Sequence, residues 1–270
     1  MRIQYIITGK RHKDDMNSTN IHFMTLLQEY ICKYDYVDIV DHAPDIAHVC
    51  GNWNIETIRQ IKKIIQNEIP VIFTSCNGLN DFSGNIQRYQ SLIMRDLIRN
   101  VSAIHVCGII EKEKIQHVCP DSCIYVVSNP VISNTTDANN MTSLMLKTYN
   151  SIINNYDKRK KETIKSIIHA QYTKDDEIFE ICSRFLYIKY LLHKGNIPID
   201  TLKETSSMMI TKQYDEDEME KLIKKLGIYD FVSSLLHAMN IKTGLTEGFM
   251  PIESSNNKLS ETIIDTITGN

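Results

Sequence analysis

Two kinds of hydrophobic pattern follow one another along this chain. In the first half, short runs of apolar and β-branched residues alternate with stretches in which apolar residues recur at helical spacing. A parallel sheet produces this alternation, because its consecutive strands need crossover connections that are usually helices. The pattern predicts an α/β domain with a parallel sheet and helices on both of its faces.

The expected elements of this domain alternate strictly between strand and helix. Strands are expected at residues 3–8, 45–50, 70–75, 102–107 and 123–128. Amphipathic helices are expected at residues 20–34, 54–67, 85–100 and 109–118. We therefore expect a Rossmann-like domain over residues 1–135.

The second half of the chain carries a different pattern. Residues 132–140 are polar and lack periodicity, which predicts a linker, and the strand pattern ends there. Helices are expected at residues 141–156, 162–171, 175–194, 200–209, 215–226 and 229–241, with a weaker pattern at 259–267. Gly195 and Gly227 stand where two of these helices should stop. The pattern predicts an all-helical domain over residues 141–270.

Composition narrows the function classes. The 270 residues are 42% hydrophobic and 23% charged, with a net charge of only −3, which is typical of a soluble globular protein and disfavours nucleic acid as a partner. No stretch approaches the roughly 18 apolar residues of a membrane span, and the N-terminus reads as a strand instead of a signal peptide. We therefore expect a cytoplasmic protein in which the seven cysteines are reduced thiols.

The carboxyl ends of the predicted strands are the expected place for a ligand. Small and amide residues follow several of these strands, and we take them as candidate substrate-binding residues: Cys50, Gly51, Asn52, Cys76, Asn77, Gly78 and Asn129. No loop carries the GxGxxG dinucleotide fingerprint or the P-loop motif, so no nucleotide cofactor is expected. We leave the catalytic residues unassigned.

Four segments of the first half carry a family resemblance. They read PDIAHVCGNW at residues 44–53, IPVIFTSCNG at 69–78, VSAIHVCGIIEKEKI at 101–115 and IYVVSNPV at 124–131. In this order and spacing they resemble the N-terminal, acceptor-side domain of family-four glycosyltransferases of the two-domain GT-B type. The resemblance covers about residues 1–135, which is half of the chain.

This resemblance implies transfer of a sugar from a nucleotide sugar to a glycan or lipid-linked acceptor, in the assembly of a surface polysaccharide. Cys50 and Cys76 stand where the family has histidine, and Cys107 stands where it has serine. The family continues into a second Rossmann domain that binds the donor, whereas this chain continues into helices. The seven candidate residues are therefore expected to contact an acceptor through backbone and side-chain amides, and not to transfer protons.

Two alternative functions remain open. The chain is equally compatible with a non-catalytic binding module, a pseudoenzyme whose helical half docks a partner transferase. A receiver-like signalling domain is a weaker alternative, because Cys50 and Cys76 stand where such a domain would need acidic residues.

Zinc binding and nucleophilic catalysis are two further chemistries open to cysteine, and neither is expected here. His105, Cys107, His117, Cys119 and Cys123 are zinc-type ligands but lack the spacing of a zinc knuckle, so no metal is expected. Cys76 at a strand end has no identifiable partner base, which argues against a nucleophilic thiol.

Overall fold

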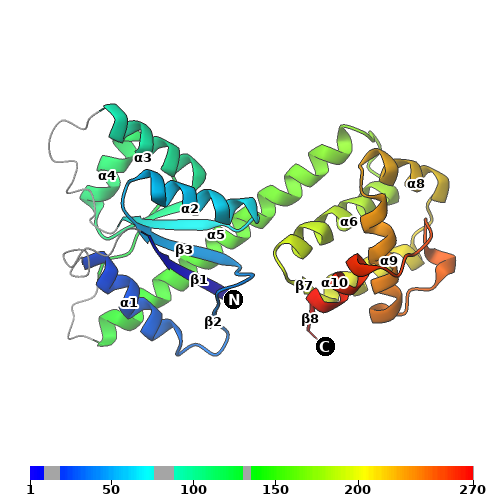
Figure 1. The fold of residues 1–270 in the computed structure, drawn as a ribbon, viewed down its shortest axis with the longest axis horizontal. Helices are drawn as coiled ribbons and strands as arrows, with labels where there is room; N and C mark the ends of the chain where they lie inside the picture. Colours follow the sequence, from blue (N-terminus) through cyan, green and yellow to red (C-terminus); the bar gives the residue numbers. More distant parts are fainter. Residues whose placement is uncertain (9–18, 76–87, 130–134, 270) are drawn as a thin grey trace. The chain divides into compact units, whose positions relative to one another are not determined.

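The computed structural model describes residues 1–8, 19–75, 88–129 and 135–269. These residues form two compact units, one over Met1–Tyr156 and the other over Asp157–Asn270. The first unit is an α/β unit and the second is helical, as the two hydrophobic patterns predict (Figure 1).

The α/β unit is built on one parallel sheet of six strands in the order β2-β1-β3-β4-β5-β6. Its strands are β1 (Arg2–Ile7), β2 (Asp38–Ile39), β3 (Ile46–Gly51), β4 (Val71–Ser75), β5 (Ala103–Val106) and β6 (Ile124–Val126). Every pair is parallel, which confirms the predicted Rossmann-like sheet. Only β2, which is two residues long, was not predicted.

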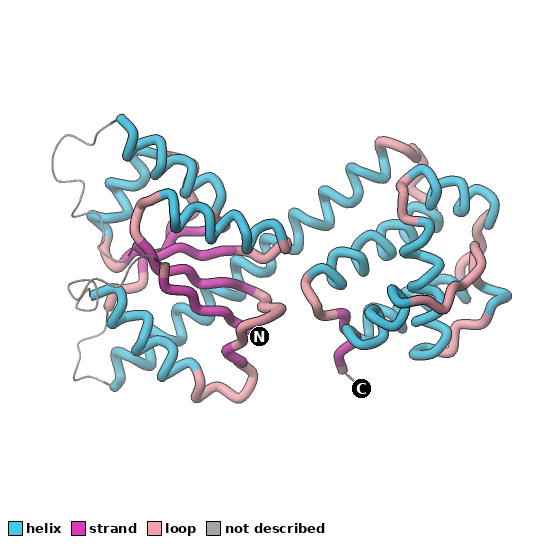
Figure 2. Tube along the Cα trace, in the orientation of Figure 1, coloured by secondary structure: helices cyan, strands magenta, loops and turns pink. Residues whose placement is uncertain are grey.

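Helices cover both faces of the sheet, as Figure 2 shows. On one face, α1 (Thr19–Ile31) and the first half of α5 (Thr135–His169) pack against β1, β3 and β4 in one apolar cluster. On the other face lie α2 (Ile55–Gln66), α3 (Arg88–Asn100) and α4 (Ile109–Val118). β3 and β4 are buried along their whole length, which explains their nearly continuous apolar sequences.

Local sequence signals set the bounds of α2, which matter for the site. The side chain of Asn54 caps the helix by accepting a hydrogen bond from the backbone N–H of Thr57 at 2.9 Å. Ile58, Ile61 and Ile64 are buried against the sheet at helical spacing. The cap and the stripe together fix where this helix begins and which face it buries.

The expected linker is the main local difference from the sequence analysis. Residues 135–140 are the first turns of α5, which continues without a break to His169. Residues of its first half, including Met145 and Tyr149, are fully buried against the sheet, so this stretch belongs to the α/β unit. A polar first turn hides a helix start, because Thr and Asp are favourable at helix N-termini without contributing to an apolar stripe.

The helical unit contains the second half of α5 and five further helices among the described residues. These are α6 (Glu177–His193), α7 (Ile199–Thr211), α8 (Glu216–Lys225), α9 (Tyr229–Thr243) and α10 (Lys258–Thr266). A short 3-10 helix, η3 (Glu247–Phe249), follows α9, and a two-residue parallel pair joins β7 (Ile197–Pro198) to β8 (Ile267–Thr268).

Two predicted helix stops are confirmed. Gly195 and Gly227 have φ angles of 67° and 65°, the left-handed conformation that glycine adopts without a steric penalty. After each glycine, the next N–H reaches back to the last turn: Asn196 N donates to Leu191 O at 3.1 Å, and Ile228 N to Ile223 O at 3.2 Å. These bonds satisfy carbonyl groups that would otherwise end the helix without partners.

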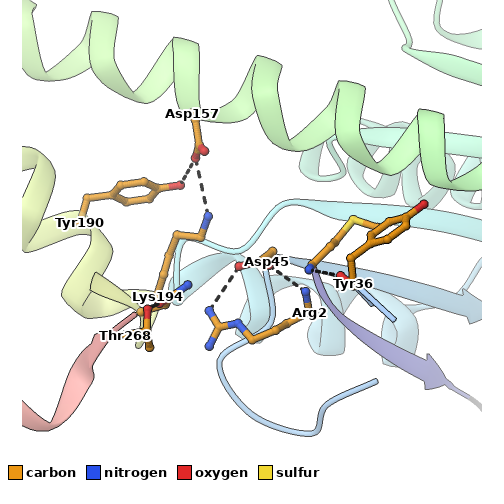
Figure 3. A network of polar contacts seen from close by, with 9 residues as sticks. Arg2, Tyr36, Asp45, Asp157, Tyr190, Lys194 and Thr268 are labelled. Carbon is orange, nitrogen blue, oxygen red and sulfur yellow. Dashed lines mark hydrogen bonds and ion pairs between the residues drawn. The ribbon is translucent and has the colours of Figure 1, made fainter. Parts of the chain in front are cut away.

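A buried ion pair holds the second half of α5 in the helical unit. The ammonium group of Lys194, whose side chain is 6% exposed, lies 3.6 Å from the carboxylate of Asp157 on α5. The hydroxyl of Tyr190 donates to the same carboxylate at 2.8 Å (Figure 3). A charge this deeply buried requires a partner, so this contact is sensitive to the loss of either residue.

Candidate binding site at the carboxyl edge of the sheet

The topology defines one edge of the sheet as the candidate site. Because all six strands are parallel, the carboxyl ends of β1, β3, β4, β5 and β6 share one edge. The strand order reverses between β1 and β3: β2 lies on one side of β1, and β3 to β6 follow on the other. Ligands of open α/β sheets bind beside such a switch point, where the loops diverge.

Gly51 closes the turn between β3 and α2 at this switch point. A Cβ atom at Gly51 would lie 2.0 Å from the hydroxyl oxygen of Thr8 and 2.7 Å from that of Thr57. These two hydroxyls are hydrogen-bonded to each other at 2.7 Å, directly over the glycine. The chain therefore needs glycine here because the end of β1 and the first turn of α2 approach its backbone too closely for a side chain.

Asn52 follows Gly51 and carries an unusual polar group. Its side-chain oxygen is buried and has no hydrogen-bond partner within the described parts of the chain. The neighbouring Asn54 differs, since its side chain is engaged in capping α2. A buried amide oxygen without a donor costs free energy, and a ligand hydroxyl could supply the missing donor.

A second set of polar groups lies at the ends of β5 and β6. The thiol of Cys107 donates to the side-chain oxygen of Asn129 at 3.2 Å, and the backbone N–H of Cys107 donates to Glu111 at 3.3 Å. Burial, with a smaller contribution from the charge of Glu111, raises the pKa of Cys107 to about 12, so this sulfur stays protonated. Burial also raises the pKa of Glu111.

The start of α4 is open beside these groups. Gly108 is its N-cap residue and provides no side-chain cap, and a Cβ atom there would meet no atom within 4 Å. The first N–H groups of a helix favour hydrogen-bond acceptors and negative charge. The described part of this edge thus combines amide, thiol and backbone groups with the carboxylate of Glu111.

The seven predicted binding residues fall into three groups. Gly51, Asn52 and Asn129 lie at the carboxyl edge. Cys50 requires a correction, because its side chain is fully buried in the apolar cluster beneath α1 and α5 and cannot face a ligand at the edge. Cys76, Asn77 and Gly78 lie outside the described residues.

Sequence reasoning missed a chain of hydrogen bonds that crosses the sheet. His48 on β3 and His105 on β5 are both fully buried, and the hydroxyl of Thr74 on β4 lies between their rings. Its oxygen is 2.7 Å from Nε2 of His48 and 2.9 Å from Nδ1 of His105. Nε2 of His105 reaches the carbonyl oxygen of Val127 at 2.9 Å, and the ring of Phe23 on α1 stacks on His105.

The direction of these bonds follows from their last acceptor. The Val127 carbonyl can only accept, so Nε2 of His105 carries the proton and its Nδ1 accepts from Thr74. The Thr74 oxygen then accepts from Nε2 of His48, whose Nδ1 in turn accepts from the hydroxyl of Tyr149, 2.5 Å away. This assignment holds for neutral imidazoles, each of which carries one proton.

Burial supports this protonation state. It lowers the pKa of His105 to about 4, and it lowers the pKa of His48 well below its usual value, with His105 adding to the effect. Every ring nitrogen of the two histidines is engaged inside the core, so neither ring serves as a base at the edge. The signal was present in the sequence, since HVC occurs at residues 48–50 and again at 105–107.

His105 is engaged in the core, and no group of three or more potential metal ligands gathers among the described residues.

Among the described residues, no helix combines the length and the apolar character needed to cross a bilayer.

No protein-family model matches the chain, and no curated protein shows a significant match to it. The glycosyltransferase resemblance therefore stays a prediction carried by the four short segments.

Proposed function

We propose that this chain is a glycosyltransferase-like protein of glycan assembly whose α/β unit binds a carbohydrate acceptor at the carboxyl edge. The unpartnered oxygen of Asn52 is the observation that carries the proposal. It lies beside Gly51 at the switch point of the sheet, where ligands of this architecture bind. A sugar hydroxyl donates and accepts hydrogen bonds, so it suits both this oxygen and the amides around it.

The edge favours binding over proton transfer. The two histidines of the sheet are neutral and fully engaged, and Cys107 holds its proton. In an active transferase, the donor would be a nucleotide sugar. We place the protein in the cytoplasm, where nucleotide sugars are made.

One observation favours the alternative of a non-catalytic binding module. The resemblance calls for a second sheet domain that binds the donor, and the described residues after α5 are helical apart from the short β7–β8 pair. In this alternative a separate chain provides the donor site, and the helical unit is the part that docks it. Transfer assays with the single chain separate the two, because only an intact transferase releases nucleotide from a donor sugar without a partner.

The binding itself can be tested by calorimetry and thermal shift against UDP-, GDP-, ADP- and TDP-sugars and a panel of free glycans. A ligand at a hundred times its dissociation constant adds about 2.7 kcal/mol of stability, which is readily measured. We expect Asn52→Ala to abolish glycan binding without destabilising the free protein, because the substitution removes a buried acceptor that has no partner.

Asn67→Ala is the matched control, since Asn67 is exposed at the opposite end of α2. It should leave glycan binding unchanged. The proposal would be overturned if no ligand of the panel bound, or if wild type and Asn52→Ala bound glycans equally well.

A further inference from the structure

The helical unit contains a cleft of about 620 Å³ that the proposed function does not use. It lies among the second half of α5, α6 and α7, and its volume is in the range of small-molecule sites. The side chains of Ile164 and Phe179, which line it, are themselves buried, so they form an apolar floor. Charged side chains of both signs line the rest of the cleft.

Contacts between α5 and α6 show how these charges are arranged. The ammonium of Lys161 lies 4.8 Å from the centre of the Tyr187 ring, and the rings of His169 and Phe179 are 4.4 Å apart. The later residue of α5 meets the earlier residue of α6, so the two helices run antiparallel. Positions near Lys161 therefore lie at one end of the cleft, and positions near the α5–α6 turn lie at the other.

The end near Lys161 has an excess of cationic side chains, with one lining carboxylate, Glu204, paired to Arg184. Lys161 and Lys165 are one turn apart on α5, and Arg184 of α6 lies at their level by the same antiparallel register. One guanidinium nitrogen of Arg184 lies 2.7 Å from the carboxylate of Glu204. No ion pair with a described residue engages Lys165. These groups leave donors for the oxygens of an anion.

Tyr187 adds a neutral donor at the same end. Burial raises its pKa to about 12, with a further contribution from Asp157, so the hydroxyl keeps its proton at neutral pH. Its ring lies beside Lys161 and forms part of the cleft wall. A phosphate group here would meet two ammonium groups, a guanidinium and a phenol.

The other end, near the α5–α6 turn, is anionic. Asp175 and Glu180 line it, and the Asp175 carboxylate is 3.3 Å from His169. The side chain of Glu180 makes no ion pair or hydrogen bond with a described residue, although its backbone N–H donates to Asp176 O at 3.0 Å. Carboxylates accept hydrogen bonds from hydroxyl groups but repel phosphate, so this end suits the polyhydroxyl part of a ligand.

We propose that this cleft binds a sugar phosphate, with the phosphate held among Lys161, Lys165 and Arg184 and the sugar hydroxyls donating to Glu180 and Asp175. The excess of cationic groups at one end and of carboxylates at the other matches a ligand that carries phosphate at one end and hydroxyl groups at the other. The apolar floor suits the C–H face of a sugar ring. This site is independent of the carboxyl edge of the sheet and stands without the function proposed for that edge.

The test is calorimetry or phosphorus NMR titration of the full chain with glucose 1-phosphate, inorganic phosphate and glucose as probes. Glucose 1-phosphate should bind more tightly than inorganic phosphate, and glucose should not bind to the cleft. Lys165→Glu should weaken binding of glucose 1-phosphate about tenfold or more, as expected for losing a charged hydrogen bond and adding repulsion. Glu180→Gln should weaken glucose 1-phosphate while leaving inorganic phosphate unaffected.

Lys158→Glu is the matched control, because it makes the same charge change on an exposed position of α5 outside the cleft. It should leave binding within twofold of wild type. Unchanged binding in Lys165→Glu, or equal affinity for the ester and for inorganic phosphate, overturns the assignment, as does an absence of binding by every probe. If Asn52→Ala loses binding of glucose 1-phosphate and Lys165→Glu keeps it, the ligand binds at the sheet edge. That result would overturn the cleft proposal and leave the function proposed for the edge standing.

Discussion

The two units bury polar groups by opposite means. The α/β unit places two neutral histidines, a threonine and a tyrosine in its core and satisfies them with hydrogen bonds between strands and helix. The helical unit buries the charged ammonium of Lys194 and pairs it with Asp157. A neutral network depends on pH and on every hydroxyl in it, whereas an ion pair depends mainly on the presence of both charges.

The same contrast distinguishes the two candidate sites. The sheet edge offers amides, backbone N–H groups and a protonated thiol, and the helical cleft offers ammonium, guanidinium and carboxylate groups. Neutral donors and acceptors suit a carbohydrate, and segregated charges suit a sugar phosphate. The contrast between the two units leads to four predictions about their stability.

Acid should destabilise the α/β unit through its neutral histidines. The pKa of His105 is lowered from 6.5 to about 4 on folding, so the unfolded chain binds the proton more readily between these values. Its stabilising contribution is complete above pH 6.5 and is lost as the pH falls toward 4, by about 1.4 kcal/mol per pH unit. Urea unfolding followed by the fluorescence of Trp53, the only tryptophan, reports on this unit. Equal stability at neutral pH and at pH about 5 would contradict the assignment.

Asp157→Ala should destabilise the helical unit by about 3 kcal/mol, because it leaves the Lys194 ammonium buried without its partner. Hydrogen exchange in α6 measures the loss. Lys62→Met is the comparison, since Lys62 pairs with Asp96 on an exposed surface and its loss should cost less than about 1 kcal/mol. Similar losses of stability in Asp157→Ala and Lys62→Met would show that the Lys194–Asp157 pair contributes no more than an exposed ion pair.

Thr74→Val should destabilise the α/β unit by about 2 kcal/mol, because it removes the hydroxyl that joins the two histidines and leaves ring nitrogens of both without partners. Thr142→Val is a matched control. The hydroxyl of Thr142 is equally buried but bonds only to a carbonyl of its own helix, Ala138 O at 2.8 Å. If Thr74→Val loses no more stability than Thr142→Val, the hydrogen bonds between the two histidines contribute no extra stability.

Gly51→Ala should cost about 1–3 kcal/mol, because the added methyl group collides with the Thr8 and Thr57 hydroxyls. Gly108→Ala, where the added carbon meets open space, should cost less than about 1 kcal/mol. Urea unfolding followed by Trp53 fluorescence compares them. Equal stability of the two variants would mean that the turn after β3 relaxes freely.

Much of the fold could be predicted because it rests on local signals. The alternation of apolar runs and amphipathic stripes placed five strands of the sheet and its covering helices, and Asn54, Gly195 and Gly227 marked helix ends. The start of α5 could not be placed, because its first turn is polar and its identity as a helix depends on what its later residues pack against.

The candidate site was predictable only in part. Strand ends are visible in the sequence, so Gly51, Asn52 and Asn129 could be placed at one edge. Cys50 was misplaced because strand residues alternate between faces, and its face is decided by what packs on the sheet. The cleft of the helical unit had no sequence signal, since Lys165 and Glu180 read as ordinary exposed charges until α5 and α6 lie side by side.

Periodicity and capping act over a few residues, so they were enough to predict the class of each half, the parallel sheet and the bounds of many elements. The folded structure was needed to show that His48, Thr74 and His105 share one chain of hydrogen bonds and that Lys194 pairs with Asp157. These contacts join residues far apart in the chain. Their partners are chosen by strand order and helix packing, which no local pattern specifies.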